Sequence, residues 1–152
     1  MNILRGVTGH PTHPPATDVA IGCYTFATLA SIAEAVNFHQ SIVAGAAYYA
    51  LLVGLAATVA AAITGFLDYL AIPSATPLRK AATYHWLVMV TASVLFIAAA
   101  VSMRGTYAAG KITTTGLVLD LLGYAVMSVG GWLGGILVFQ HGMRVKDGPS
   151  AE

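Results

Sequence analysis

Four long apolar stretches, separated by short turns, constrain this chain more than any other feature. They cover roughly residues 16–36, 41–71, 81–103 and 113–141. Each reaches the length of about 20 residues that a helix needs to cross a bilayer. Only 9% of the 152 residues are charged, whereas soluble domains contain roughly 25%. The chain is therefore predicted to be an all-α integral membrane protein whose first partner is the lipid bilayer.

The turns between these stretches predict how the helices are arranged. Residues 37–40 are so few that the helices on either side must be antiparallel neighbours. Residues 72–80 contain two prolines, which end one helix and begin the next. The prediction is a four-helix up-down-up-down bundle with both termini on the same side. Residues 1–152 read as a single transmembrane domain without an internal repeat.

The positive charges indicate an orientation in the membrane. Five of the seven Lys and Arg residues fall at the end of the bundle that holds the termini, and two fall at the other end: Arg5, Arg79, Lys80, Arg144 and Lys146 against Arg104 and Lys111. Because Lys and Arg accumulate on the cytoplasmic side, the termini are predicted to be cytoplasmic. A net charge of +1 without a basic block argues against nucleic acid as a partner.

Ionisable side chains gather at the same end as the termini. Four histidines and one aspartate belong to this cluster: His10, His13, Asp68, His85 and His141. Ionisable groups are costly in a bilayer, so such a cluster is by default a functional site. Imidazole is a good ligand for iron, copper and zinc alike. His39 lies at the opposite end, near Glu34, where the two could form a small proton or quinone site, although a solvated turn is the favoured interpretation.

Two aspartates in the apolar stretches have competing interpretations. Asp68 is suited to hold the N–H of a ligating histidine, which is the usual role of a carboxylate beside a metal site. It is equally well explained as the ion-pair partner of Arg79 or Lys80. Asp120 lies inside the fourth stretch, and its partner cannot be named from the sequence.

Glycines share a helix face with His141. Counting back by helical spacing from His141 gives Gly134 and Gly130. Small residues four positions apart allow two membrane helices to pack closely. The same smooth surface is also suited to a planar cofactor such as haem. These glycines therefore predict either helix packing or one wall of a cofactor site.

In this order, these landmarks resemble a known family. The segments that carry the resemblance are Gly9-His10-Pro11-Thr12-His13-Pro14, Gly65-Phe66-Leu67-Asp68-Tyr69-Leu70, His85, and the block from Gly130-Gly131-Trp132-Leu133-Gly134-Gly135 to His141-Gly142. They are similar to the four-helix bacterial membrane proteins of domain-of-unknown-function family 2231. The resemblance implies a multi-pass protein of the bacterial inner membrane, and relatives joined to a Rieske-type iron–sulfur domain imply redox work. Family members usually continue with a further His-Phe-Pro, where this chain has Ala16-Thr17-Asp18-Val19.

Together, the residues and the resemblance favour a b-type cytochrome-like subunit. His85 and His141 are the first choice as ligands of haem b, because they lie at similar depth on adjacent antiparallel helices. The other residues expected at the cofactor site are His13, His10, Asp68, Gly130 and Gly134. His10 or His13 is expected to replace one of the first pair or to ligate a second haem. Electrons would then pass between a redox protein and quinone, without substrate chemistry on this chain.

Two further hypotheses stay open from the sequence. In the first, the same histidines hold a copper, iron or zinc ion with Asp68 nearby, and the protein supports transport or membrane-bound catalysis. In the second, the chain has no cofactor and is a structural or assembly subunit. Its glycine faces would then contact other subunits in a homo-oligomer or a larger membrane complex.

Overall fold

The structure, a computed structural model, is a bundle of four long helices. It describes residues 3–7 and 10–145, so that Lys146 lies outside the described part. The helices are α1 (His13–Ala35), α2 (Gln40–Leu70), α3 (Pro77–Met103) and α4 (Thr114–Gly135), and a π-helical turn, Ile136–Gln140, extends α4. Each of the four is long and apolar enough to cross a membrane. The predicted all-α, four-helix membrane bundle is confirmed.

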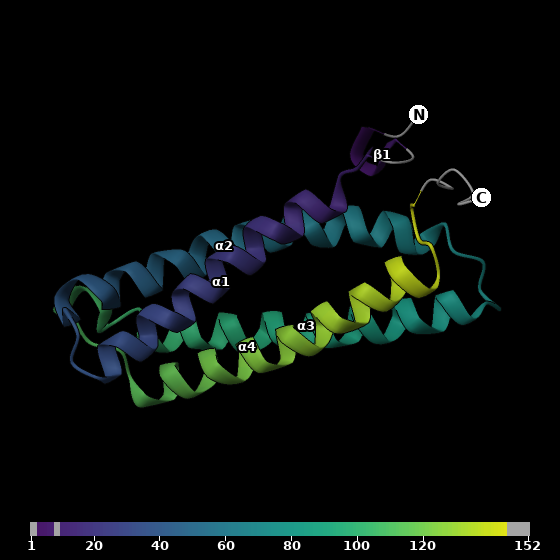
Figure 1. The fold of residues 1–152 in the computed structure, drawn as a ribbon. Coiled ribbons are helices and arrows are strands. Elements are labelled where there is room, and N and C mark those ends of the chain that lie inside the picture. Colours follow the sequence, from purple (N-terminus) through teal and green to yellow (C-terminus); the bar gives the residue numbers. More distant parts are fainter. Residues whose placement is uncertain (1–2, 8–9, 146–152) are drawn as a thin grey trace, which may run out of the picture.

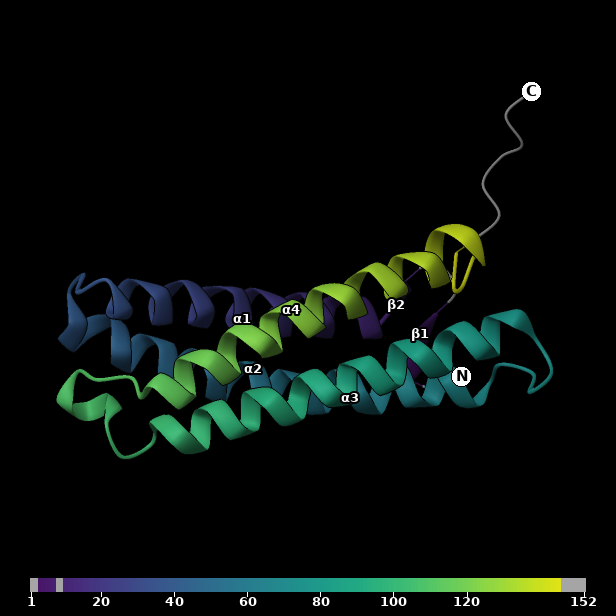
Figure 2. The ribbon, with the colours of Figure 1, turned by 90° about the horizontal axis from the view of Figure 1, so that it is seen from below.

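The bundle consists of two helical hairpins. Figure 1 shows α1 beside α2 in one layer and α3 beside α4 in the other, with successive helices running in opposite directions. Helix α1 begins and α4 ends at the same end of the bundle, which also holds the connection from α2 to α3. The view from below shows the same arrangement (Figure 2). We call this end of the bundle the histidine end, and the other the turn end.

Short elements close both ends. Before α1, a 3₁₀ turn (Ile3–Arg5) leads into a two-stranded antiparallel hairpin of β1 (Gly6–Val7) and β2 (His10–Pro11). At the turn end, a 3₁₀ turn (Tyr107–Ala109) lies between α3 and α4. The N-terminal hairpin therefore brings the chain to the histidine end just before α1 starts.

Helix α1 begins three residues earlier than the sequence predicted. His13 is its first residue, and Pro14 and Pro15 occupy its first turn. The N–H groups of a first turn have no partner within the helix, so proline costs little there and its fixed φ favours the helix. Because proline also biases the residue before it toward an extended conformation, the same residues could have placed His13 in a loop. Instead they start the helix, and His13 is held by α1 rather than by a loop.

Threonine side chains mark the starts of α3 and α4. The Thr76 hydroxyl accepts the N–H of Arg79 at 3.1 Å, and the Thr113 hydroxyl accepts the N–H of Gly116 at 2.9 Å. Each bond satisfies one of the free N–H groups of a helix start. The α3 start is further favoured by Pro77 as its first residue. Both starts are thus encoded locally.

The two hairpins repeat the same contacts. His85 of α3 lies 72 positions after His13 of α1, and Phe96 lies 72 positions after Tyr24. Tyr24 and Phe96 are both buried at the centre of the bundle. Ala20 and Ala92, which are also 72 positions apart, are both buried as well. Helices α1 and α3 therefore present equivalent faces to the core.

Helices α2 and α4 are also equivalent to each other, and their corresponding residues are 69 positions apart. An alanine Cβ at Gly54 would lie 2.8 Å from the Tyr24 ring, and one at Gly123 would lie 2.9 Å from the Phe96 ring. Each glycine lets an aromatic ring of the same hairpin pack against the backbone. The sequence concealed this repeat because most equivalent positions carry different side chains, for example Leu51 and Asp120.

Candidate functional site

Two histidines at equivalent positions of the two hairpins form the centre of the candidate site. His13 of α1 places its Nδ1 2.9 Å from the carbonyl oxygen of Ala61 on α2. His85 of α3 places its Nδ1 2.9 Å from the carbonyl oxygen of Gly130 on α4. Each imidazole is thus bonded to the neighbouring helix of its own hairpin. The Thr64 hydroxyl lies 3.3 Å from the same nitrogen of His13.

These bonds fix the tautomer of both rings. A carbonyl oxygen can only accept a hydrogen bond, so Nδ1 must carry the proton in His13 and in His85. In a neutral imidazole the proton on Nδ1 leaves a lone pair on Nε2. None of the hydrogen bonds in the described part of the chain uses the Nε2 of either ring. Both rings therefore keep a ligand nitrogen available.

Glycines make room for the two rings. An alanine Cβ at Gly65 of α2 would lie 2.7 Å from Cε1 of His13. One at Gly134 of α4 would lie 3.3 Å from Cε1 of His85. Gly65 and Gly134 are themselves 69 positions apart. The site is thus built twice, from a histidine on one helix and a carbonyl and a glycine on the next.

Side chains of α3 fill the space beside the predicted glycine face of α4. The His85 ring lies over Gly134, and the Met89 side chain is packed directly against Gly130. Gly130 also supplies the carbonyl that His85 binds. These two glycines therefore contact the histidine and its neighbour one turn along α3.

The two rings lie at the same end of the bundle. His13 is the first residue of α1, and His85 lies within α3. Both rings are only partly exposed at the histidine end of the bundle. One ring comes from each hairpin.

Asp68 pairs with both ends of the chain. Arg5 Nε donates to Asp68 Oδ1 at 2.9 Å, and Arg144 Nε lies 3.7 Å from the same oxygen. Arg144 also donates to the carbonyl oxygen of Arg5. Asp68 itself is only 4% exposed. This carboxylate ties the N-terminal segment and the end of α4 to α2.

The two interpretations of Asp68 from sequence both differ from this arrangement. Arg79, one expected partner, donates instead to the carbonyl oxygens of Tyr69 and Ile72 at 2.7 and 3.0 Å, closing the end of α2. Its guanidinium also lies over the Tyr69 ring at 3.6 Å. The hydrogen bonds described for Asp68 involve an arginine and no histidine. Arg5 and Arg144 were not considered because their separation from Asp68 in sequence gives no signal.

The other two candidate histidines lie at the surface. His10 is exposed on β2, where it pairs with Val7 of β1. His141 is exposed directly after the π-helical turn that ends α4. Within residues 3–7 and 10–145, no group of three or more His, Cys, Asp or Glu side chains is placed to hold a metal ion. Of the predicted cluster, His13 and His85 are therefore the two histidines that the structure shows bonded to a neighbouring helix.

A second buried carboxylate lies near the turn end. Asp120 of α4 is fully buried and accepts hydrogen bonds from Thr28 at 3.0 Å and from Ser31 at 2.7 Å, both on α1. These are the partners that the sequence could not name. A carboxylate bonded by two hydroxyl groups ties α4 to α1 inside the bundle. Glu34 is also buried, beside Gln40, whereas His39 is exposed.

Comparisons with known proteins agree with this architecture. The family model described as a predicted membrane protein (DUF2231) matches residues 9–147. That range includes all four helices and both histidines of the candidate site. No curated protein and no solved structure matches the chain.

Proposed function

Because this chain belongs to the DUF2231 family of predicted membrane proteins, and each hairpin holds one histidine by Nδ1 at the same end of the bundle, we propose that it is a membrane electron-transfer subunit. In this proposal, His13 and His85 ligate a b-type haem. The partners are a redox protein and quinone. His13 thereby takes the place that we expected for His141, since His141 is exposed beyond the end of α4.

The observation that carries the proposal is the matched orientation of the two imidazoles. A metal-ligating histidine nearly always donates its other ring N–H to a carbonyl or carboxylate, which fixes the tautomer and the ring plane. The bonds from His13 to Ala61 and from His85 to Gly130 are of this kind. The same bond recurs in both hairpins, so both rings have a fixed tautomer with the lone pair on Nε2.

The number of ligands favours haem over a bare ion. Bis-histidine ligation of haem takes two imidazoles, whereas a closed zinc site takes four protein ligands. His13 and His85 supply two, from opposite hairpins. A haem held by His13 and His85 would supply a one-electron couple, without substrate chemistry on this chain.

The residues around the histidines have defined roles in this proposal. The carbonyl oxygens of Ala61 and Gly130 hold the rings in place, and Gly65 and Gly134 provide the space that the rings need. Hydrogen bonding to the ligands and burial are the means by which a protein adjusts such a site. The pairing of Asp68 with Arg5 and Arg144 holds the segments around these two arginines at the histidine end of the bundle.

The test is a visible absorption spectrum of the purified protein, oxidised and then reduced with dithionite. The wild type should show sharp reduced bands, and His13→Ala and His85→Ala should each abolish them. His39→Ala is the matched control, because His39 is exposed at the opposite end of the bundle. A colourless wild type, or one whose bands survive both ligand substitutions, would refute the haem proposal.

Metal analysis of the same sample distinguishes the remaining hypotheses. Stoichiometric copper, zinc or iron without haem bands would point to the bare-ion site. A folded protein with neither haem nor metal would point to a structural or assembly subunit.

We further propose that the protein lies in the bacterial inner membrane with its termini in the cytoplasm. The support is the positive charge at the histidine end, which holds Arg5, Arg79, Lys80 and Arg144 among the described residues. Alkaline phosphatase fused after the last residue should be inactive in cells. Activity of that fusion, which requires export, would reverse the orientation.

A further inference from the structure

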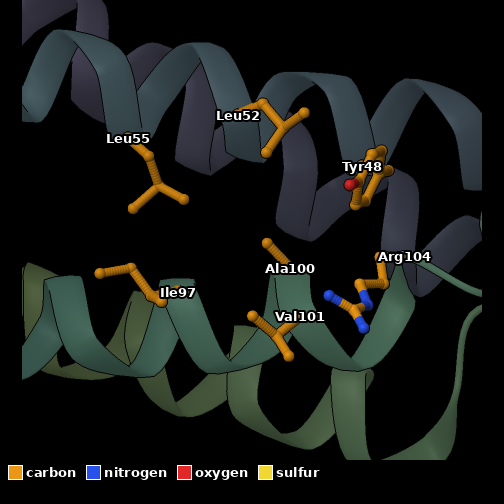
Figure 3. A pocket seen from close by; sticks show the side chains of 7 residues that line it. All are labelled: Tyr48, Leu52, Leu55, Ile97, Ala100, Val101 and Arg104. Atoms are coloured by element: carbon orange, nitrogen blue, oxygen red, sulfur yellow. The ribbon is translucent and has the colours of Figure 1, made fainter.

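An apolar groove lies between α2 and α3, away from the histidines. It has a cavity volume of about 220 Å³ and opens to the outside of the bundle. Figure 3 shows Leu52 and Leu55 of α2 facing Ile97 and Val101 of α3 across it, with Ala100 between them. Within a bilayer, this opening faces the hydrocarbon of the lipids.

One end of the groove is polar. Tyr48 of α2 and Arg104, the residue after α3, line it there, at the turn end of the bundle (Figure 3). Arg104 follows the last residue of α3, so it stands where the helix leaves the membrane. The groove thus runs from an apolar stretch to a cation at the membrane edge.

Aromatic packing holds the Tyr48 wall in place. The Tyr48 ring stacks on Tyr107, with centroids 3.9 Å apart and an angle of 7° between the planes. Tyr49 meets the same Tyr107 ring edge-on at 5.5 Å. Tyr107 belongs to the 3₁₀ turn between α3 and α4. This end of the groove is therefore shaped by three rings from two segments.

The Arg104 side chain has no ion-pair partner among the described residues. Both ion pairs in the described part of the chain involve Asp68 at the histidine end, and no described carboxylate pairs with Arg104. The residue is exposed, and no described hydrogen bond uses its guanidinium group. A guanidinium presents N–H groups in a geometry that matches phosphate. Its natural partner at the membrane edge is therefore an anion.

We propose that this groove binds an anionic phospholipid. Its phosphate pairs with Arg104, and part of one acyl chain lies against Leu52, Leu55, Ile97 and Val101. Charge selects this occupant, because a basic residue between membrane helices attracts acidic lipid head groups. Size agrees with it, since a pocket that encloses a whole small molecule has about 300–1,000 Å³. The groove is smaller and open, which suits a segment of chain that remains partly in the bilayer.

The test measures how lipids bind to the detergent-purified, delipidated protein. Phosphatidylglycerol and phosphatidylcholine with the same acyl chains are compared by native mass spectrometry. The wild type should bind phosphatidylglycerol about fivefold more tightly, as expected from one basic residue near a head group. Equal affinity for the two lipids would overturn the proposal.

Three variants identify the groove as the site. Arg104→Gln should bring the ratio of the affinities for phosphatidylglycerol and phosphatidylcholine close to one. Ala100→Leu should weaken the binding of both lipids by filling the groove. Lys111→Gln is the matched control, because Lys111 is an exposed cation at the same end and does not line the groove. An equal loss in Lys111→Gln and Arg104→Gln would mean a diffuse effect of charge, and would overturn the proposal.

Two further probes separate the lipid from other ligands. Inorganic phosphate has the charge but no chain, so it should not displace bound phosphatidylglycerol at equal concentration. Decylubiquinone has a chain but no charge, so it should displace bound phosphatidylglycerol only weakly, and to the same extent in the wild type and in Arg104→Gln. Displacement by decylubiquinone that Arg104→Gln abolishes would assign the groove to quinone instead.

Discussion

Tyr24 of α1 stacks face to face on Phe96 of α3, with ring centroids 3.8 Å apart and an angle of 4° between the planes. The Tyr24 hydroxyl lies 2.8 Å from the Thr58 hydroxyl, which donates its own proton to the Gly54 carbonyl, so Tyr24 is the donor of that bond. Both aromatic rings lie 11 positions beyond a histidine of the candidate site. The stack therefore joins the two hairpins, on the side of the candidate site that faces the turn end of the bundle.

Phe96→Ala should strongly destabilise the protein. Phe96 is fully buried, and removal of such a ring leaves a cavity that costs about 3–5 kcal/mol. Phe26→Ala is the matched control, because Phe26 is 55% exposed on the outer face of α1. Denaturant unfolding in detergent micelles measures both. Equal losses of stability would show that the stack does not hold the hairpins together.

Gly65→Ala should disturb the site more than Gly134→Ala. The added Cβ would lie 2.7 Å from the His13 ring in the first variant and 3.3 Å from the His85 ring in the second. We expect a lower melting temperature for Gly65→Ala, with loss of the haem bands if the proposed function holds. Gly134→Ala should show a smaller change in both measurements.

The controls for this comparison are Gly45→Ala in α2 and Gly131→Ala in α4. A Cβ at either position meets nothing within 4 Å. Alanine is more stable than glycine inside a helix by roughly 0.5–1 kcal/mol. Both controls should therefore melt at the same temperature as the wild type or higher. A drop as large as that of Gly65→Ala would mean that the effect is not steric.

Asp68→Asn should loosen both ends of the chain. The substitution removes the charge that pairs with Arg5 and Arg144. Breaking a fully buried pair costs about 3–5 kcal/mol. Here we expect a smaller loss, about 1 kcal/mol, because the two arginine side chains are 30% and 22% exposed and water screens their charges. Trypsin cleavage after Arg5, followed by mass spectrometry, should become faster.

Asp18→Asn serves as the comparison for Asp68→Asn. Asp18 is exposed near the start of α1. Its replacement should leave both the stability and the rate of cleavage close to those of the wild type. If the two variants were cleaved at the same rate, Asp68 would have no role in holding the N-terminal segment.

His10→Ala and His141→Ala should leave the haem bands unchanged. Both side chains are exposed, and neither shares the bond to a neighbouring helix that orients His13 and His85. Reduced-minus-oxidised spectra of the two variants, normalised to protein, provide the measurement. Loss of the bands in His141→Ala with retention in His13→Ala would restore the pair that the sequence favoured, His85 and His141.

Local signals in the sequence were sufficient for the helices. Apolar stretches of bilayer length, the prolines of residues 72–80 and the capping Thr113 determine where the spans lie and where they are interrupted. These features act through neighbouring residues, so they can be read from the chain alone. The start of α1 was misjudged because Pro14 and Pro15 are compatible with both an extended segment and a first helical turn.

The pairing of residues across the bundle was decided only by the tertiary structure. The sequence brought four histidines to one end, but their depth along a helix could not show that His13 and His85 occupy equivalent places. Likewise, the partners of Asp68 and Asp120 lie on other elements and are far away in sequence. Such contacts depend on the rotation of each helix about its axis, which is determined by how the small and aromatic side chains of both hairpins pack together.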